Sequence, residues 1–262
     1  MGRTSTRAKA MYKLCLSICL LLTACIPGFR STRYVPPEEA AWFKFPSELP
    51  LDGRKELPGA MATAIQLALD DFLPRGAGYP WGATPQQICL RQRQSYDVEV
   101  ARGSEGVIWV TVGLSPGACT LGPGPLLDVG TTYAVDTTGW RIRARSGDGT
   151  QTEFPRTDVP ESGRRQVPAN MAAAIQLSLD DFLPRGAKPS SEPGREACLE
   201  RRDSYDVTAA PAPDGVVLVQ FVVNPAVCAT HESIVDVTNY AVDVRTMRIL
   251  SIQRRTRPRD QT

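Results

Sequence analysis

Residues 61–77 of this 262-residue chain read MATAIQLALDDFLPRGA, and residues 171–187 read MAAAIQLSLDDFLPRGA. The two segments are identical at fifteen of seventeen positions. Shorter matches follow both copies in the same order, pairing Cys89 with Cys198, Ser95-Tyr96-Asp97-Val98 with Ser204-Tyr205-Asp206-Val207, Cys119 with Cys228, and Tyr133 with Tyr240. Ordered matches at a nearly constant offset predict two homologous repeats along the chain.

The repeated segment predicts one helix in each copy. Met61, Ile65, Leu69 and Phe72 recur at helical spacing and form one apolar stripe. Pro58 precedes this stripe, in a position that the first turn of a helix tolerates, and Pro74 prevents continuation. The second copy repeats the pattern with Met171, Ile175, Leu179, Phe182, Pro168 and Pro184.

Four strands are expected after each helix. In the first copy, Tyr96 and Val98 alternate with polar neighbours, and residues 107–112 form a second apolar strand after a turn at 102–106. Residues 133–136 and 140–145 flank a second turn. In the second copy the last hairpin covers 240–243 and 248–252. The predicted fold class is therefore α+β, with two tandem repeats that each pack one helix on a four-stranded antiparallel sheet.

The order of one helix and four strands resembles cystatin-like folds. The ending YAVDTTG at residues 133–139 resembles the last hairpin of PepSY modules. These resemblances imply a role in the control of a peptidase.

The later cysteines predict two disulfides. Cys89 and Cys119 are thirty residues apart, as are Cys198 and Cys228. The midpoints, residues 104 and 213, lie in the turns of the predicted hairpins, so each bridge is expected to close the open end of a hairpin. A metal site is the alternative, but neither cysteine pair has a CxxC spacing or a histidine partner.

The N-terminus carries Arg3, Arg7, Lys9 and Lys13 and then an apolar run over residues 14–24. This run is shorter than the roughly 20 residues that span a bilayer. Together with Leu22-Thr23-Ala24-Cys25 it resembles a bacterial lipoprotein signal with its lipobox. The resemblance implies cleavage before Cys25, lipid on its sulfur and an anchor in the cell-envelope membrane. Residue 26, directly after the lipidated cysteine, is isoleucine, which resembles the sorting pattern of outer-membrane lipoproteins. An ordinary secretory signal that ends in cysteine is the alternative.

The sequence predicts six segments. They are a signal peptide at 1–24, a lipidated tether at 25–56, repeats at 57–145 and 167–253 with a linker at 146–166 between them, and a basic tail at 254–262. The tail is expected to be a solvated, frayed end. Within the tether, Trp42-Phe43-Lys44-Phe45 is expected to dock on the first repeat.

Little in the sequence indicates catalysis. Without the leader, 26 Lys and Arg face 28 Asp and Glu, which does not favour nucleic acid as a partner. Residues 113–117 match G-x-S-x-G, but Pro116 prevents the helix that a nucleophile elbow requires. His231, the sole histidine, is interpreted as a loop residue. No catalytic residue, metal site or cofactor is predicted.

Some polar residues are identical in the two copies although core packing does not require it. They are Gln66, Asp70, Asp71 and Arg75, and in the second copy Gln176, Asp180, Asp181 and Arg185. The hypothesis is a binding surface presented twice, either to a partner or to each other. A recent partial duplication explains the identity equally well.

The function expected from these features is a lipid-anchored, non-enzymatic binding or scaffolding module with a protein partner in the envelope. A peptidase inhibitor or PepSY-like regulator of a secreted protease is the first alternative, and an enzyme of unknown type is the second.

Overall fold

The computed structural model describes residues 33–76, 78–119, 130–146, 161–185, 194–228 and 234–258. Residues from Tyr34 onward belong to one compact unit. The predicted signal peptide, Cys25 and His231 lie outside the described residues.

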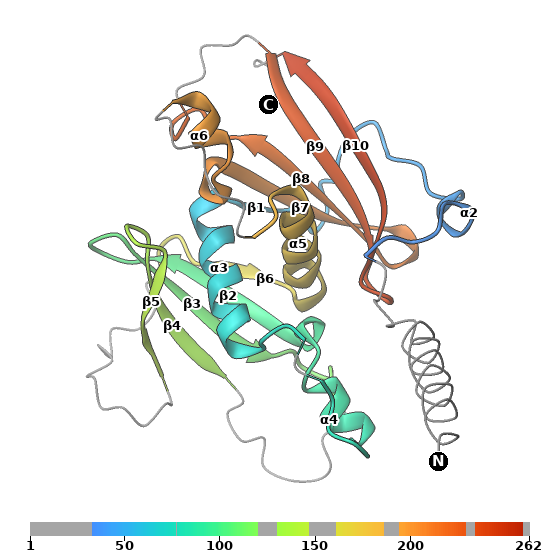
Figure 1. Cartoon of the computed structure of the whole chain (residues 1–262), viewed down its shortest axis with the longest axis vertical. Coiled ribbons are helices and arrows are strands. Elements are labelled where there is room, and N and C mark those ends of the chain that lie inside the picture. The colour runs from blue at the N-terminus through green and yellow to red at the C-terminus, as the bar shows by residue number, and fades with distance from the viewer. Residues whose placement is uncertain are drawn as a thin grey trace, which may run out of the picture. The chain divides into compact units, whose positions relative to one another are not determined.

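The chain is α+β, as its sequence predicts, and has two antiparallel five-stranded sheets (Figure 1). The first sheet has the order β5-β4-β3-β2-β6, and the second has the order β1-β7-β8-β9-β10. The strands of the first sheet are β2 (Tyr96–Arg102), β3 (Val107–Leu114), β4 (Thr131–Asp136), β5 (Arg141–Arg145) and β6 (Arg165–Val167). Those of the second are β1 (Lys55–Leu57), β7 (Tyr205–Ala212), β8 (Val216–Val223), β9 (Ile234–Asp243) and β10 (Arg248–Pro258). Each sheet thus has one strand more than the four expected.

The two predicted helices are present as α3 (Gly59–Phe72) and α5 (Ala169–Phe182). Leu73 has an extended backbone just before Pro74, where the helix ends as predicted. The shorter helices are α2 (Pro37–Ala40), α4 (Pro85–Cys89) and α6 (Arg195–Leu199), with single 3₁₀ turns η1 (Arg93–Ser95), η2 (Arg202–Ser204) and η3 (Pro213–Gly215). Among the described residues, no helix has both the length and the apolar character needed to cross a membrane.

The additional strand of each sheet comes from the other half of the chain. Strand β1 directly precedes α3 yet pairs with β7, where Leu57 lies opposite Val207. Strand β6 directly precedes α5 yet pairs with β2, where Val167 lies opposite Val98. The boundaries expected at residues 56/57 and 166/167 therefore fall inside strands that join the halves.

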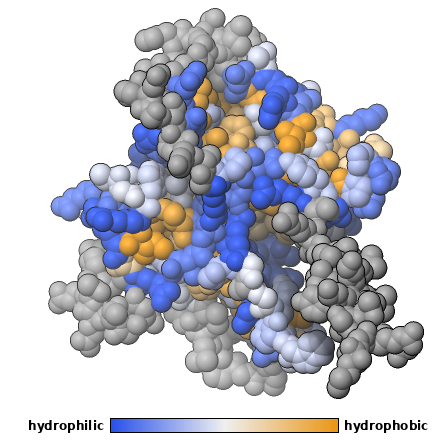
Figure 2. All heavy atoms as spheres, viewed as in Figure 1, coloured by the Kyte–Doolittle hydropathy of each residue, from blue (hydrophilic) through white to orange (hydrophobic). Residues whose placement is uncertain are grey.

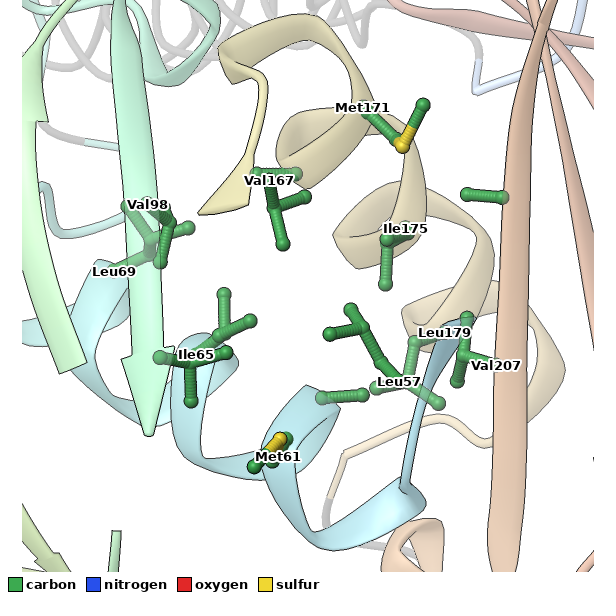
Figure 3. Close-up of a cluster of buried hydrophobic side chains, with 14 of the residues drawn as sticks. Leu57, Met61, Ile65, Leu69, Val98, Val167, Met171, Ile175, Leu179 and Val207 are labelled. Carbon is green, nitrogen blue, oxygen red and sulfur yellow. The ribbon is translucent and has the colours of Figure 1, made fainter. Parts of the chain in front are cut away.

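Helices α3 and α5 contact each other, and their apolar side chains share one core with both sheets. Figure 3 shows the labelled side chains of this core between the strands that carry Val98 and Val207. They are Leu57, Met61, Ile65 and Leu69 from β1 and α3, and Val167, Met171, Ile175 and Leu179 from β6 and α5. On the outside, hydrophilic residues cover most of the face seen in Figure 2, and hydrophobic residues gather in separate patches.

The first turn of each helix is held by the opposite sheet. Both helices have proline as the N-cap residue, and proline has no side chain that can cap. Instead, Asp97 on β2 accepts a hydrogen bond from the Ala169 backbone N–H at 2.8 Å, and Asp206 on β7 accepts one from the Gly59 N–H at 3.3 Å. Gly59 also lies so close to the second half that a Cβ there would be 2.4 Å from the Tyr205 carbonyl oxygen. Only glycine fits at this contact.

Both predicted disulfides are present. Cys89 is bonded to Cys119 and Cys198 to Cys228, each with Cα atoms 5.8 Å apart. The β2–β3 ladder opens at Tyr96 opposite Leu114, and the cysteines lie just beyond that end. The ladder is therefore centred on residue 105, one residue later than the predicted midpoint.

Two expectations about connecting segments are wrong. Phe43 and Phe45 pack on the outer face of the second sheet, against a cluster that includes Leu218 and Leu250, and not on the first repeat. The reason is that the chain enters along β10, where the Val35 N–H donates to the Ile249 carbonyl oxygen at 2.9 Å. The basic tail is not frayed over residues 254–258, because these residues continue β10 in register with β9.

The shared core predicts that residues 34–258 unfold in one cooperative step. Leu57 lies on β1, which pairs with the sheet of the other half of the chain. The substitution Leu57→Ala should lower the free energy of unfolding by about 2–5 kcal/mol, because removing a fully buried leucine side chain leaves a cavity. Chemical denaturation followed by far-UV circular dichroism and tryptophan fluorescence checks this, and both signals should shift together. Leu51→Ala is the control, since Leu51 is 80% exposed. Two separated transitions, of which Leu57→Ala moves only one, would show that the halves fold independently.

Candidate functional site

The polar faces of α3 and α5 meet each other inside the fold. Gln66 and Asp70 are four residues apart and so lie on the same side of α3; Gln176 and Asp180 repeat this on α5. The Gln66 side-chain amide donates to the Asp180 carboxylate at 2.7 Å. The sequence left open whether this surface is presented to a partner or to the other copy. In the structure, the two copies contact each other through it.

Arginines connect the two helices. Arg75, just beyond α3, forms an ion pair with Asp180, and Arg185, just beyond α5, forms one with Asp70. Arg185 also contacts Asp180 on its own side at 2.9 Å, and Arg75 contacts Asp70 at 3.4 Å. Each aspartate therefore interacts with an arginine from both halves of the chain.

Arg93 and Arg202, which the sequence analysis did not select as candidates, complete this cluster. Arg93 donates to the Gln176 side-chain oxygen at 2.7 Å and to Asp70 at 2.8 Å. Arg202 donates to the Gln66 side-chain oxygen, and it contacts Asp180 at 3.2 Å. A signal was available, because Arg93 and Arg202 occupy the same place relative to Cys89 and Cys198 in the two copies.

Arg93 and Arg202 also bind the ends of the helices. Arg93 donates to the Leu73 carbonyl oxygen at 2.5 Å, and Arg202 donates to the Leu183 carbonyl oxygen. These are carbonyls that a helix C-terminus leaves without an intrahelical partner. Positive charge there offsets the unfavourable placement of acidic residues near the negative end of the helix dipole.

The cluster holds four arginines and two aspartates. Burial alone would raise the pKa of Asp70, but hydrogen bonds from Arg185 and Arg93 outweigh it and hold that pKa below its ordinary value. Burial lowers the pKa of Arg93 and of Arg202. A carboxyl group with a depressed pKa is a poor proton donor near neutral pH. The electrostatics of Asp70 therefore suit a structural role better than acid catalysis.

Asp71 and Asp181 point to other partners. Asp71 forms an ion pair with Arg145 of β5 at 3.0 Å. Asp181 accepts a hydrogen bond from the Tyr240 hydroxyl at 3.1 Å and another from Tyr34. Six of the eight residues in the hypothesis thus lie in the contact between the copies. The other two, Asp71 and Asp181, each connect their helix to a strand of the same half of the chain.

Ser115 of the G-x-S-x-G match has a structural partner. Its hydroxyl donates to Asp97, the residue that caps α5. The match lies at the end of β3 and in the turn after it.

An open groove lies on the outer face of the second sheet, with a volume of about 900 Å³. Its floor includes Thr208, Gln220 and Val222, and residues 47–58 form one wall. Four arginines line it, namely Arg54, Arg102, Arg165 and Arg255, together with the acidic residues Glu48, Glu56 and Asp206. This groove had no signal in the sequence, because its residues come from both halves and from the segment before the first repeat.

Comparison of the chain with protein-family models, with curated proteins and with solved structures found no match.

The arginine–aspartate cluster predicts a pH-dependent contribution to stability. Because the folded-state pKa of Asp70 is depressed, its contribution is present above the pKa of the unfolded chain and is lost as the pH falls through the folded-state value. At neutral pH, Asp70→Asn should lower the free energy of unfolding by about 1–3 kcal/mol, since it leaves Arg93 and Arg185 short of a partner.

Denaturation at neutral and acid pH measures the effect. The difference between the wild-type chain and Asp70→Asn should shrink as the pH falls below about 4. Asp52→Asn, an exposed change elsewhere, is the control. A difference that stays constant over this range would contradict a role for the ionised carboxylate.

Proposed function

We propose that this chain is a lipid-anchored protein of a bacterial cell envelope that acts as a non-enzymatic binding module. The observation that carries the proposal is the pair of disulfides, Cys89–Cys119 and Cys198–Cys228. Structural disulfides form and persist in oxidising compartments such as the periplasm and the cell surface. The lipobox-like segment Leu22-Thr23-Ala24-Cys25 supports the same address and a lipid on Cys25.

The module consists of two tandem repeats with a cystatin-like order of one helix and four strands. Supporting this, α3 and α5 have the same length and are followed by equivalent elements: a short helix, a 3₁₀ turn and the strands β2–β5 or β7–β10. The strands β1 and β6 are then exchanged between the repeats, and the repeats form one binding unit.

Binding suits the site better than catalysis. The polar residues that stand out in the sequence bind one another, as in the contact of Gln66 with Asp180, and Asp70 carries a depressed pKa. The open groove on the second sheet instead offers a polar surface to a ligand. With a lipid at residue 25, this surface is held close to a membrane and to its partner in the envelope.

Mass spectrometry of the full chain from a bacterial host tests the anchor. The expected product begins at Cys25 and carries a thioether-linked diacylglycerol with or without an N-acyl chain, and it fractionates with membranes. Cys25→Ser should abolish the lipid and release the chain, because acylation supplies the hydrophobic attachment. Cys89→Ser is the matched control, which loses a later cysteine and keeps the lipid. A wild-type chain that retains residues 1–24, or begins at Cys25 without lipid, would contradict the anchor.

Thiol mapping on the same material tests the compartment. The four cysteines after Cys25 should resist alkylation until a reductant is added. Reduction should lower the free energy of unfolding by about 3–4 kcal/mol for each disulfide, as loop closure over thirty residues predicts. Free thiols at all four positions in the native host would contradict an oxidising location.

A further inference from the structure

The groove on the second sheet continues a surface that the chain itself partly covers. Along β8, alternate residues face the same side of the sheet. Val216 and Leu218 on this side are buried under residues of the segment 35–49, whereas Gln220 and Val222, next along the strand, line the groove. The open groove is therefore the uncovered part of a sheet face whose apolar part is already occupied.

The arginines of the groove differ from those of the helix cluster. In the part of the chain that the structure describes, none of Arg54, Arg102, Arg165 and Arg255 forms an ion pair with a carboxylate. By contrast, Arg75, Arg93, Arg185 and Arg202 are all paired with aspartates. Four guanidinium groups thus reach one groove with their charge uncompensated by an ion pair.

Three of these guanidinium groups are held in place by backbone carbonyls. Arg54 donates to the Pro50 carbonyl oxygen at 3.0 Å and to that of Leu49. Arg255 donates to the Ser47 carbonyl oxygen at 3.0 Å, and Arg165 donates to that of Glu56. A guanidinium carries five N–H donors, so each retains others for a ligand. These bonds orient the groups before a ligand arrives, which lowers the entropy cost of binding.

The acidic residues of the groove offset part of this charge but leave it positive. Asp206 is hydrogen-bonded to the Asn224 side-chain amide at 3.0 Å and to the Gly59 N–H. Glu48 and Glu56 are exposed and face the same groove. Four arginines against three acids leave one net positive charge. Glu48 and Glu56, which form no ion pair within the described part of the chain, would repel an anion that the arginines attract.

We infer that this groove binds a ligand that carries two or more oxyanion groups, either carboxylates or phosphates. Guanidinium groups bind both by paired, charge-assisted hydrogen bonds. The volume of about 900 Å³ suits a ligand of several such groups rather than a single small ion. Gln220 and Asn224 also line the groove, and their side-chain amides donate to Asn239 and to Asp206. This inference deepens the proposed binding function and rests on it.

Calorimetric titration of the full chain in an uncharged detergent tests the inference with two probes, a tetraglutamate peptide and inorganic tripolyphosphate. At least one probe should bind, with an affinity that falls as salt is raised. Arg102→Gln should weaken binding by about threefold to tenfold, because it removes an exposed guanidinium that forms no ion pair or side-chain hydrogen bond with the described residues. Glu48→Gln should strengthen binding by about twofold to fivefold, because it removes repulsion.

Arg91→Gln is the control, since Arg91 is exposed as Arg102 is but lies outside the groove. Circular dichroism verifies that each variant folds. Binding by only one probe identifies the oxyanion as carboxylate or phosphate. Absence of binding by both probes, or equal affinities in the wild type and in Arg102→Gln, would overturn the inference. Neither result depends on lipid at Cys25, so failure here is distinct from failure of the envelope anchor.

Discussion

The structure depends on the pairing of two short strands, β1 and β6, each with the sheet of the other half of the chain. Through Leu57 opposite Val207 and Val167 opposite Val98, each half completes the other's sheet. Once these strands are in place, α3 and α5 start beneath the opposite sheet. There Asp97 and Asp206 bind the N-termini that the prolines leave uncapped. The capping, the close approach at Gly59 and the common core all follow from this exchange.

The exchange also explains why the helices carry polar residues at their contact. A pair of helices between two sheets can be joined by apolar side chains alone, and buried ion pairs are weak contributors to net stability. The cluster of Asp70, Asp180 and four arginines instead links the two helices through directional polar contacts. Gln66 illustrates this, because it donates to Asp180 and accepts from Arg202 at once. Leucine there could do neither, and glutamate could only accept. In the second copy, Gln176 accepts from Arg93, and its amide nitrogen has no hydrogen-bond partner among the described residues.

Local signals predicted most of the elements but not their partners. The spacing of Met61, Ile65 and Leu69 predicts α3, and the equal separation of the cysteines predicts both disulfides. The strands β1 and β6 have only three residues each and no alternation long enough to detect. Their partners lie 150–154 residues away along the chain for β1 and 65–69 residues away for β6, which no local pattern encodes. Identity of the polar residues between the copies did indicate a shared role, but it could not distinguish an outside partner from the other copy.

The groove arises where the likeness between the two halves is broken. Only the second sheet receives the segment that contains Phe43 and Phe45, and that segment covers the apolar part of its outer face. The same segment continues into the groove wall, where Arg255 of β10 binds its backbone at Ser47. The N-terminal segment thus builds the groove as well as linking the compact unit to the predicted anchor at residue 25. The groove therefore needs the N-terminal segment as well as residues of both halves of the chain.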